Sequence, residues 1–239
     1  MLSIKNLSVS IERKKILQDI SFDFKPGKTY AILGPNGSGK STLASTLLGH
    51  PNFLLSRNAK ITFQRKNIQS LSPNKRATLG LFLSFQTPLA LPGVTIFDLL
   101  RLALEKKIDP VTLHKKIQEY AKELDIKEEL LRRSLNDGFS GGEKKKMEAL
   151  QAVLLAPQFA LFDEVDTGVD VDALKKITQF LKKHLPKKTT RVFITHSAKL
   201  LQYVKPDHVL VMKEGRLVKT GSVILAKKIE RFGFDVIPI

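Results

Sequence analysis

Hydrophobic and polar residues alternate along the first 24 positions, most clearly in Leu7-Ser8-Val9-Ser10-Ile11. Alternation with a period of two is typical of β-strands. A Pro26-Gly27 turn signal follows, and the apolar run at 30–33 is typical of a strand buried on both faces. Later short apolar runs predict five further strands, at residues 60–63, 81–84, 159–162, 191–195 and 208–212.

Between these strands, apolar residues recur at the spacing of an α-helix. Helices are expected at 42–48, from Ser72-Pro73 onward, at 142–155 and at 172–184. Because strands and helices alternate along the chain, we expect an α/β fold whose sheet is mainly parallel and carries helices on its faces.

Residues 86–138 break this alternation. Pro88, Pro92 and Gly93 interrupt the chain, and helical periodicity then fills three consecutive stretches, at 96–104, 111–124 and 127–135. We therefore expect one domain over 1–239, divided into a core of residues 1–85 and 139–223, an inserted helical subdomain at 86–138, and a C-terminal tail at 224–239. The tail is either an amphipathic docking helix or a plain end cap.

The composition limits where such a protein works. Of its 239 residues 42% are apolar, which is enough to bury a substantial core. No apolar run approaches the roughly 18 residues of a membrane span, and the start lacks the layout of a signal peptide. No cysteine is present, which excludes disulfides and thiolate metal ligands. We expect a cytoplasmic protein without direct membrane insertion.

The net charge of +17 is large for this length and has two explanations. One is a surface for nucleic acid or for an acidic partner. The other is a general lysine bias, and 30 of the 40 basic residues are indeed lysines, although arginine is the better bidentate phosphate ligand. The lysines also form scattered pairs rather than one block. A nucleic-acid partner is therefore disfavoured, while an acidic protein partner fits both explanations.

One glycine-rich segment matches G-x-x-x-x-G-K-[ST], the pattern of a nucleotide phosphate-binding loop, and lies between a predicted strand and a predicted helix. Its glycines let backbone N–H groups converge on phosphate oxygens, and the following helix adds its positive end. Lys40 is expected to neutralise the β- and γ-phosphates, and Ser41 to bind Mg²⁺. The predicted ATP-binding residues are Gly34, Pro35, Asn36, Gly37, Ser38, Gly39, Lys40, Ser41 and Thr42.

Two acidic residues end the apolar run at 159–162. Carboxylates at the end of a buried strand are costly unless they serve an ion, so Asp163 is a predicted Mg²⁺ ligand. Glu164 points differently and is expected to orient or deprotonate the attacking water. A mere capping role for the pair is the alternative. The phosphate-binding loop disfavours it, because phosphoryl transfer needs one group for the metal and another for the nucleophile.

A second glycine motif, Ser140-Gly141-Gly142, precedes the helix expected at 142–155. Small residues at a helix start form another anion-binding end. Because the first loop already holds one nucleotide, we interpret this motif as closing over the γ-phosphate of a nucleotide held by a second copy of the chain. A transient, ATP-dependent head-to-tail homodimer is therefore expected.

These motifs resemble those of the ABC-type ATPases over nearly the whole chain. By that resemblance, residues 34–41 are the Walker A loop, 161–164 close the Walker B strand, and 140–142 are the core of the signature motif. The resemblance implies a P-loop ABC ATPase core, in which an N-terminal antiparallel β-subdomain accompanies the mainly parallel sheet, with an inserted helical subdomain.

Three further positions take their expected roles from this resemblance. Gln86 falls at the Q-loop position and is implied to sense the metal and the water. Asp170 falls at the D-loop position beside the nucleotide. His196 falls at the position of the switch histidine, which steadies the γ-phosphate.

A finer resemblance is to the SufC family, the ATPases of Suf-type iron–sulfur cluster assembly. It rests on residues 85–94, 138–145, 163–174, 205–207 and 215–219. It implies SufB/SufD-like scaffold proteins as partners, gripped near 86–94. Without cysteine this chain cannot offer thiolates to iron, so a scaffold would have to hold the cluster.

The chain departs from the usual family pattern at a few positions. Lys146 stands where an arginine is usual, and Val169 where a leucine is usual. Ile11 stands where many ABC ATPases stack the adenine on an aromatic ring. Loss of that stack costs about 1 kcal/mol, which predicts modest ATP affinity and weak base selectivity.

Three other functions share parts of this pattern. The ATPase subunit of a membrane transporter has the same chemistry and a different partner, and the variant signature at 138–145 argues against it. A nucleic-acid-linked ABC ATPase usually has two ATPase units or long coiled-coil insertions, which are not evident here. A non-catalytic ATP-gated clamp is the third.

Overall fold

A computed structural model of the protein describes residues 1–238, apart from the side chain of Ala198. The chain divides into two compact units, each described separately below. We call them the sheet unit, made of Met1–Leu83, Gln158–Glu164 and Lys187–Ile239, and the helical unit, made of Ser84–Pro157 and Val165–Pro186.

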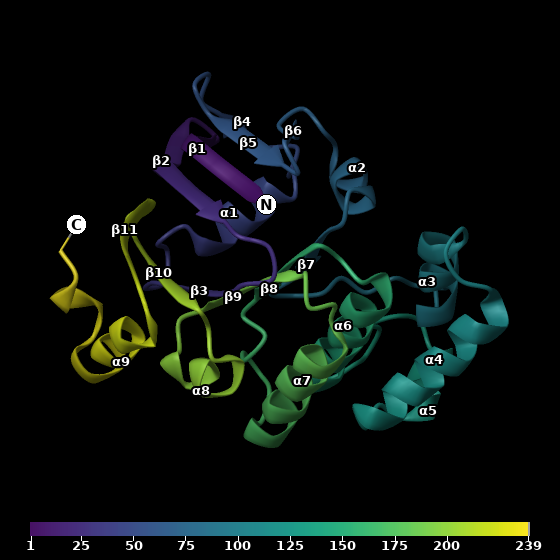
Figure 1. The fold of residues 1–239 in the computed structure, drawn as a ribbon. Helices are drawn as coiled ribbons and strands as arrows, with labels where there is room; N and C mark the ends of the chain where they lie inside the picture. The colour runs from purple at the N-terminus through teal and green to yellow at the C-terminus, as the bar shows by residue number, and fades with distance from the viewer. Residues whose placement is uncertain (239) are drawn as a thin grey trace. The chain divides into compact units, whose positions relative to one another are not determined.

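The sheet unit contains a small antiparallel sheet at its N-terminal end (Figure 1). Its strand order is β2 (Lys14–Phe24), β1 (Leu2–Ile11), β5 (Lys60–Phe63) and β6 (Lys66–Asn67), and β4 (Leu54–Leu55) pairs with β1. Asn6 has a positive φ of 49° at a shift in the β1–β2 register. Such a bulge lets both Ile4 and Leu7 face the core, although three positions separate them.

The larger sheet positions the predicted chemistry. Its strand order is β11 (Arg216–Gly221), β10 (His208–Lys213), β3 (Thr29–Leu33), β9 (Thr190–Thr195), β8 (Phe159–Asp163) and β7 (Leu81–Ser84). The four strands from β10 to β8 are parallel, and β11 is antiparallel to β10. Ligands of open parallel sheets bind outside the carboxyl ends of the strands. The segments after β3, β8 and β9 all begin at that edge.

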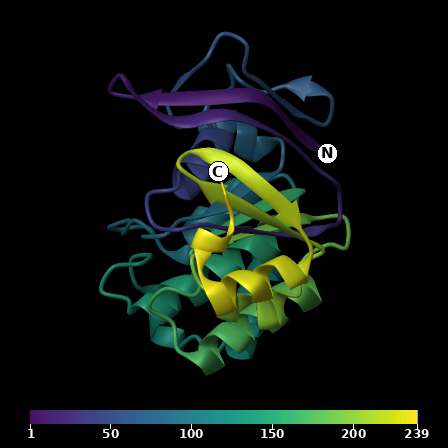
Figure 2. The same cartoon turned by 90° about the vertical axis from the view of Figure 1, so that its left-hand side faces the viewer.

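The two faces of the larger sheet bury different elements. Helix α1 (Lys40–Leu47) shares one core with both sheets, in which Leu43 and Leu47 lie among apolar side chains of β1, β3 and β8. The opposite face buries α8 (Leu201–Val204) and α9 (Val223–Phe232), the latter through Leu225 and Ile229. Figure 2 shows α9 beside the β10–β11 hairpin. The C-terminal tail therefore caps the sheet unit.

A buried arginine fastens α1 from a neighbouring element. Arg76 lies in α2 (Pro73–Thr78) and is only 2% exposed. Its guanidinium donates to the carbonyl oxygens of Thr46 and Leu47, both at 2.8 Å, at the C-terminal end of α1. These bonds satisfy carbonyls that a helix end leaves without an intrahelical partner, and the positive charge complements the helix dipole.

The helical unit consists of five named α-helices among the described residues, α3 (Ile96–Leu104), α4 (Pro110–Glu123), α5 (Glu128–Arg132), α6 (Gly141–Leu155) and α7 (Val171–His184). Helix α6 packs against α3, α4 and α7 (Figure 1). Thr95, Asp109, Ser140 and Asp170 cap the starts of α3, α4, α6 and α7 with their side-chain oxygens.

The predicted fold class is confirmed: a mainly parallel sheet, an N-terminal antiparallel sheet and a group of helices. The division of the chain differs from the expected one, because α6 and α7 cluster with the helical unit rather than with the core of 1–85 and 139–223. The packing of α6 against α3 and α4, and of α7 against α6, accounts for this, and the periodicity of each helix alone does not reveal it.

Among the described residues, the short strands β4, β6 and β11 and the short helix α8 were not predicted, and the helix expected at 127–135 covers only Glu128–Arg132. Among residues 1–238, no helix combines the length and the apolar character needed to cross a bilayer.

Candidate functional site

The glycine-rich loop between β3 and α1 has a backbone that other residues would disturb. A Cβ on Gly34 would lie 2.3 Å from the Met212 carbonyl oxygen and 2.6 Å from Ser38 Oγ. Gly37 and Gly39 have φ angles of 78° and 96°, a region that favours glycine. The loop therefore curves tightly over the end of the sheet before α1 begins at Lys40.

Lys40 is held inside this curve. Its side chain is buried, and Nζ donates to the carbonyl oxygens of Gly34 at 2.8 Å and Pro35 at 3.0 Å. Burial lowers the pKa of Lys40, and the nearby charges of Glu164 and Asp163 oppose that shift. The loop thus keeps a buried cation beside the backbone that is predicted to hold phosphate.

The carboxylate pair lies at the end of β8. Asp163 and Glu164 are 5% and 7% exposed, and Glu164 has a positive φ of 50°. A positive φ outside glycine is uncommon and is often found at functional positions. The Glu164 N–H donates to the Ile194 carbonyl oxygen in β9 at 2.9 Å. This bond holds the Glu164 backbone against β9 directly after β8 ends.

His196 directly follows β9 and lies beside Glu164. Its Nδ1 lies 3.4 Å from Glu164 Oε1, and its side chain is about half exposed. The register pairs Leu33 with Thr195 and Asp163 with Ile194. The loop, the carboxylates and His196 therefore follow three neighbouring parallel strands at one edge of the sheet.

One supporting residue was missed at the sequence level. Gly215 has a φ of 74°, and a Cβ there would lie 2.0 Å from the Ile16 carbonyl oxygen. Its N–H donates to the Ser38 carbonyl oxygen at 3.1 Å, and its own carbonyl accepts from the Gln18 N–H at 2.8 Å. It therefore joins the phosphate-binding loop to β2. A glycine between two apolar runs signals a turn but not its partner.

The residues of the sheet unit fit a nucleoside triphosphate with Mg²⁺. They offer a loop that a Cβ at Gly34 would fill, a buried cation and a buried carboxylate pair. Across residues 1–238 no group of three or more His, Asp or Glu side chains forms a metal site by itself. Mg²⁺ usually keeps waters and substrate phosphates as ligands, so two protein oxygens, such as those expected from Ser41 and Asp163, would be enough to hold it.

The second glycine motif lies at the start of α6 in the helical unit, and Ser140 is exposed. The Ser140 N–H and Oγ both donate to Glu143 Oε2 at 2.8 Å, and the Glu143 N–H points back to Ser140 Oγ at 3.3 Å. This arrangement is a capping box. The hydrogen bond from the Ser140 backbone is the main reason why the pKa of Glu143 is lowered.

The remaining predicted residues also belong to the helical unit. Gln86 is exposed and lies two residues after the end of β7. Asp170 caps α7, and its Oδ1 accepts from the Ala173 N–H at 2.8 Å. A Cβ on Gly141 would lie 3.0 Å from the Gly168 carbonyl oxygen, so the signature end of α6 meets the segment before Asp170 closely. The helical unit thus brings Gly141 near this segment, while the loop, Asp163, Glu164 and His196 meet in the sheet unit.

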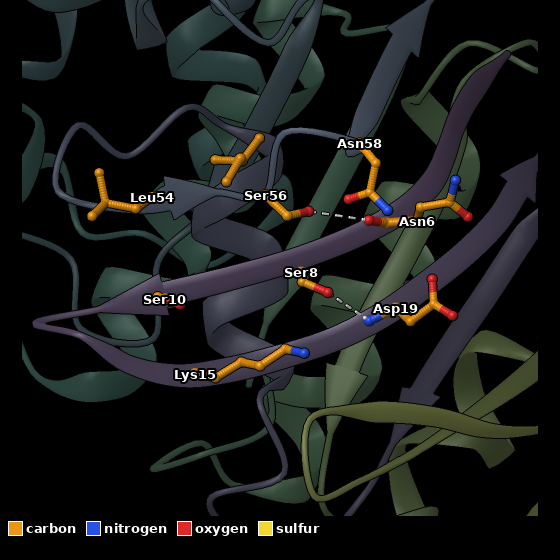
Figure 3. Close-up of a pocket in the computed structure, with 9 residues that line it drawn as sticks. Asn6, Ser8, Ser10, Lys15, Asp19, Leu54, Ser56 and Asn58 are labelled. Carbon is orange, nitrogen blue, oxygen red and sulfur yellow. Dashed lines mark hydrogen bonds between the residues drawn. The ribbon is translucent and has the colours of Figure 1, made fainter.

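An open cavity of about 710 Å³ lies elsewhere, over the small antiparallel sheet (Figure 3). Its charged lining side chains are Lys15 and Asp19. Ser8 Oγ accepts from the Asp19 N–H at 3.0 Å, and Ser56 Oγ donates to the Asn6 carbonyl oxygen at 3.4 Å. These polar groups therefore bind one another across the sheet. None of the predicted site residues lines this cavity.

Comparison with known proteins agrees with the geometry of the sheet unit. A family model described as ABC transporter matches residues 17–167. The chain is 41% identical to the probable ATP-dependent transporter ycf16 of Antithamnion sp., over 98% of this chain and 96% of that protein. It is 42% identical to a probable ABC transporter ATP-binding protein of Streptococcus pyogenes serotype M3, over 98% and 93% of the two chains.

Solved structures agree in fold. The ATP-binding subunit of an ABC transporter superposes with a TM-score of 0.79 at 23% identity, covering 98% of this chain and 93% of that one. The dimeric post-hydrolysis state of the ATP-binding cassette MJ0796 with ADP and Pi gives 0.78 at 21% identity, covering 93% and 99%. At these identities the likeness concerns the fold alone.

Proposed function

The chain belongs to the ABC transporter family as an ATP-binding ABC ATPase subunit, and from this premise we propose that it drives a conformational change of a soluble scaffold in Suf-type iron–sulfur cluster assembly. The observation that carries this proposal is the variant signature at 138–145, Gly-Phe-Ser-Gly-Gly-Glu-Lys-Lys, which resembles that of the SufC family. The absence of cysteine agrees with a role as motor rather than cluster carrier.

In the proposed mechanism, the sheet unit holds ATP. Residues 34–42 surround the phosphates with backbone N–H groups, and the Lys40 ammonium exchanges its loop carbonyls for phosphate oxygens. Ser41 and Asp163 would hold Mg²⁺, which would offset negative charge on the phosphates. Glu164 accepts a hydrogen bond from water and orients it for in-line attack. His196, next to Glu164, steadies the γ-phosphate.

The helical unit contributes to the site of a second copy in this proposal. Ser140 and Gly142 of one chain donate to the γ-phosphate held by the other, because N–H groups at a helix start favour an anion, and the phosphate replaces the Glu143 carboxylate at Ser140. Asp170 lies beside the same closure, and Gln86 senses metal and water. The relative MJ0796 cassette forms a dimer in its post-hydrolysis state, which supports a dimeric arrangement.

The proposed partner is a SufB/SufD-like scaffold that grips the segment 86–94. Two apolar side chains at or next to this segment are unusually exposed, Phe85 at 54% and Leu89 at 75%. Both side chains are therefore accessible to another protein. Closing and opening of the ATP site would then transmit force through this segment.

A second candidate partner is an integral membrane subunit. The printed names of the relatives, an ATP-dependent transporter and an ABC transporter ATP-binding protein, favour it. Purification of the tagged chain from its own cells, followed by mass spectrometry, separates the two functions. We expect soluble scaffold proteins in stoichiometric amounts. Recovery of an integral membrane subunit instead would refute the Suf assignment while leaving the ATPase chemistry in place.

Glu164→Gln tests the hydrolytic mechanism. Loss of the base is expected to lower kcat by about 10²- to 10⁴-fold, whereas ATP binding is retained because the loop and Lys40 are intact. Turnover and ATP Kd are measured separately on the full chain with its partner. Asp172→Asn serves as the control, because it also replaces a carboxylate by an amide, at an exposed position of α7. This variant is expected to hydrolyse ATP at the parental rate. Parental turnover of Glu164→Gln would exclude Glu164 as the base.

A further inference from the structure

A buried polar cluster in the helical unit is not used by the mechanism above. Glu148 lies in the middle of α6 and is 5% exposed, between the apolar residues Met147 and Ala149. Lys145, one turn earlier, is 3% exposed, and its Nζ lies 3.4 Å from Glu148 Oε2. Charged side chains are rarely buried this deeply unless they are paired. The sequence signal is two charged residues on the buried face of a helix.

The cluster binds the chain outside α6 at Ser84 and Phe85. The Ser84 Oγ donates to Glu148 Oε2 at 2.7 Å, and the Phe85 N–H donates to Glu148 Oε1 at 2.8 Å. The Phe85 carbonyl oxygen accepts from Lys145 Nζ. Both backbone polar groups of Phe85 are therefore bound by α6, one residue before Gln86, while the Phe85 side chain stays exposed.

A contribution to stability alone does not explain this cluster. Buried ion pairs often contribute little net stability compared with apolar residues of similar size, because both charges lose their hydration. Burial indeed raises the pKa of Glu148, against the opposing effects of Lys145 and of the bonds from Ser84 and Phe85. What a fully hydrogen-bonded cluster does provide is one defined geometry, since each donor and acceptor has a fixed direction.

We propose that Glu148 is a positioning residue, which together with Lys145 locks the start of the Gln86 segment onto α6. Ser140 caps the same helix about 12 Å earlier along its axis, at 1.5 Å per residue. Gln86 and the Ser140 donors are then carried by one rigid body, so that neither moves without the other. This inference rests on the proposed function, in which Gln86 senses the nucleotide of its own chain and Ser140 that of a partner copy.

Glu148→Gln is the main test, because the amide keeps the size of the side chain and removes its charge. Amide hydrogen exchange at Phe85 is read in the full-length variant and compared with the parental protein. We expect exchange at Phe85 to rise by about tenfold or more, as for loss of a hydrogen bond to an ionised group. Gln151→Ala, one turn further along α6, is the matched control and should leave Phe85 protected. Unchanged protection of Phe85 in Glu148→Gln overturns the proposal.

The catalytic readout uses a double-mutant cycle with Gln86→Ala. Misplacement of Gln86 is expected to lower kcat by up to about a hundredfold, with ATP Kd within about twofold because the loop is untouched. Glu148→Gln should then lower kcat no further once Gln86 is alanine. An equal loss in both backgrounds would mean that Glu148 is merely structural and would overturn the proposal.

Two further measurements keep the test decisive. If Glu148→Gln does not accumulate as folded protein, Ser84→Ala removes one bond of the cluster without changing charge, and the same exchange at Phe85 decides. Glu148→Asp should recover part of the parental kcat. If Gln86→Ala turns over like the parental protein, the role of Gln86 in the proposed function fails, whereas the anchor itself is then judged by the Phe85 exchange alone.

Discussion

The phosphate-binding loop and the signature end of α6 use the same elementary device in opposite settings. Each places small residues before a helix, so that backbone N–H groups face outward. In the loop, Gly34 and Ser38 are buried, and the Lys40 cation is built in. At the signature end Ser140 is exposed, and the carboxylate of Glu143 occupies its N–H and hydroxyl.

The difference concerns how much of a phosphate site each region contains. The loop combines a fixed backbone with a buried positive charge, so it is able to bind a nucleotide alone. At the signature end, the Ser140 N–H and hydroxyl are bound to an internal anion, and the buried cation of the signature, Lys145, is paired with Glu148. If this end binds the γ-phosphate held by a second chain, as proposed, the incoming phosphate has to displace Glu143. This comparison agrees with ATP-dependent rather than permanent pairing.

The largest effect on ATP binding is expected from removal of the Lys40 cation. Lys40→Ala should raise the Kd for ATP by about 10²- to 10⁴-fold, since two charge-assisted contacts to phosphate contribute about 3–6 kcal/mol together. Isothermal titration with ATP and Mg²⁺ measures it. Lys144→Ala removes a lysine from the signature end instead and should leave this Kd within about twofold. If the two variants weaken ATP binding equally, the contrast between the regions is lost.

The loop was predictable because its sequence pattern occupies eight consecutive residues. Its spacing alone identifies Lys40 and Ser41, and the adjoining strand and helix follow from periodicity. Asp163 and Glu164 were predictable for a related reason, because acidic residues at the end of an apolar run are costly without a role. The same holds for the fold class, which follows from the alternation of strands and helices.

Features that depend on distant segments were not predictable in the same way. Gly215 supports the loop through Ile16 and Ser38, which lie far away in sequence. In the sequence, nothing distinguishes Arg76 from the basic residues of the surface. In the structure it is buried and donates to a carbonyl oxygen at the end of α1. The grouping of α6 with α3 and α4 likewise depends on packing between helices that separate periodicities cannot reveal.

An intermediate effect is expected from the signature end, where Glu143→Gln removes the internal anion. A capping box accepts Gln as well as Glu at this position, so α6 should still begin at the same residue. Loss of the negative charge near the incoming γ-phosphate should tighten ATP-dependent pairing by about tenfold, or about 1–2 kcal/mol after solvent screening. Stability of the isolated chain should fall slightly, because an anion favours a helix start.

Sedimentation with and without ATP, in the Glu164→Gln background that retains the nucleotide, measures this pairing. Glu129→Gln, which removes an exposed charge from the first turn of α5, is the control. Weaker pairing of Glu143→Gln would indicate that the carboxylate helps the closed state, and the comparison of the two regions would need to be reversed.

The smallest effect is expected at the far side of the nucleotide. Ile11 ends β1 and is partly exposed, and the family resemblance places the adenine ring there. If the loop supplies nearly all of the affinity, an added aromatic ring contributes only its own stacking. Ile11→Tyr should therefore lower the ATP Kd by about fivefold, corresponding to about 1 kcal/mol, while Ile11→Val changes little. Titration with ATP and GTP measures both variants. Sub-micromolar ATP binding with strong exclusion of GTP in the parental protein would contradict this, because base recognition would then exist without the ring.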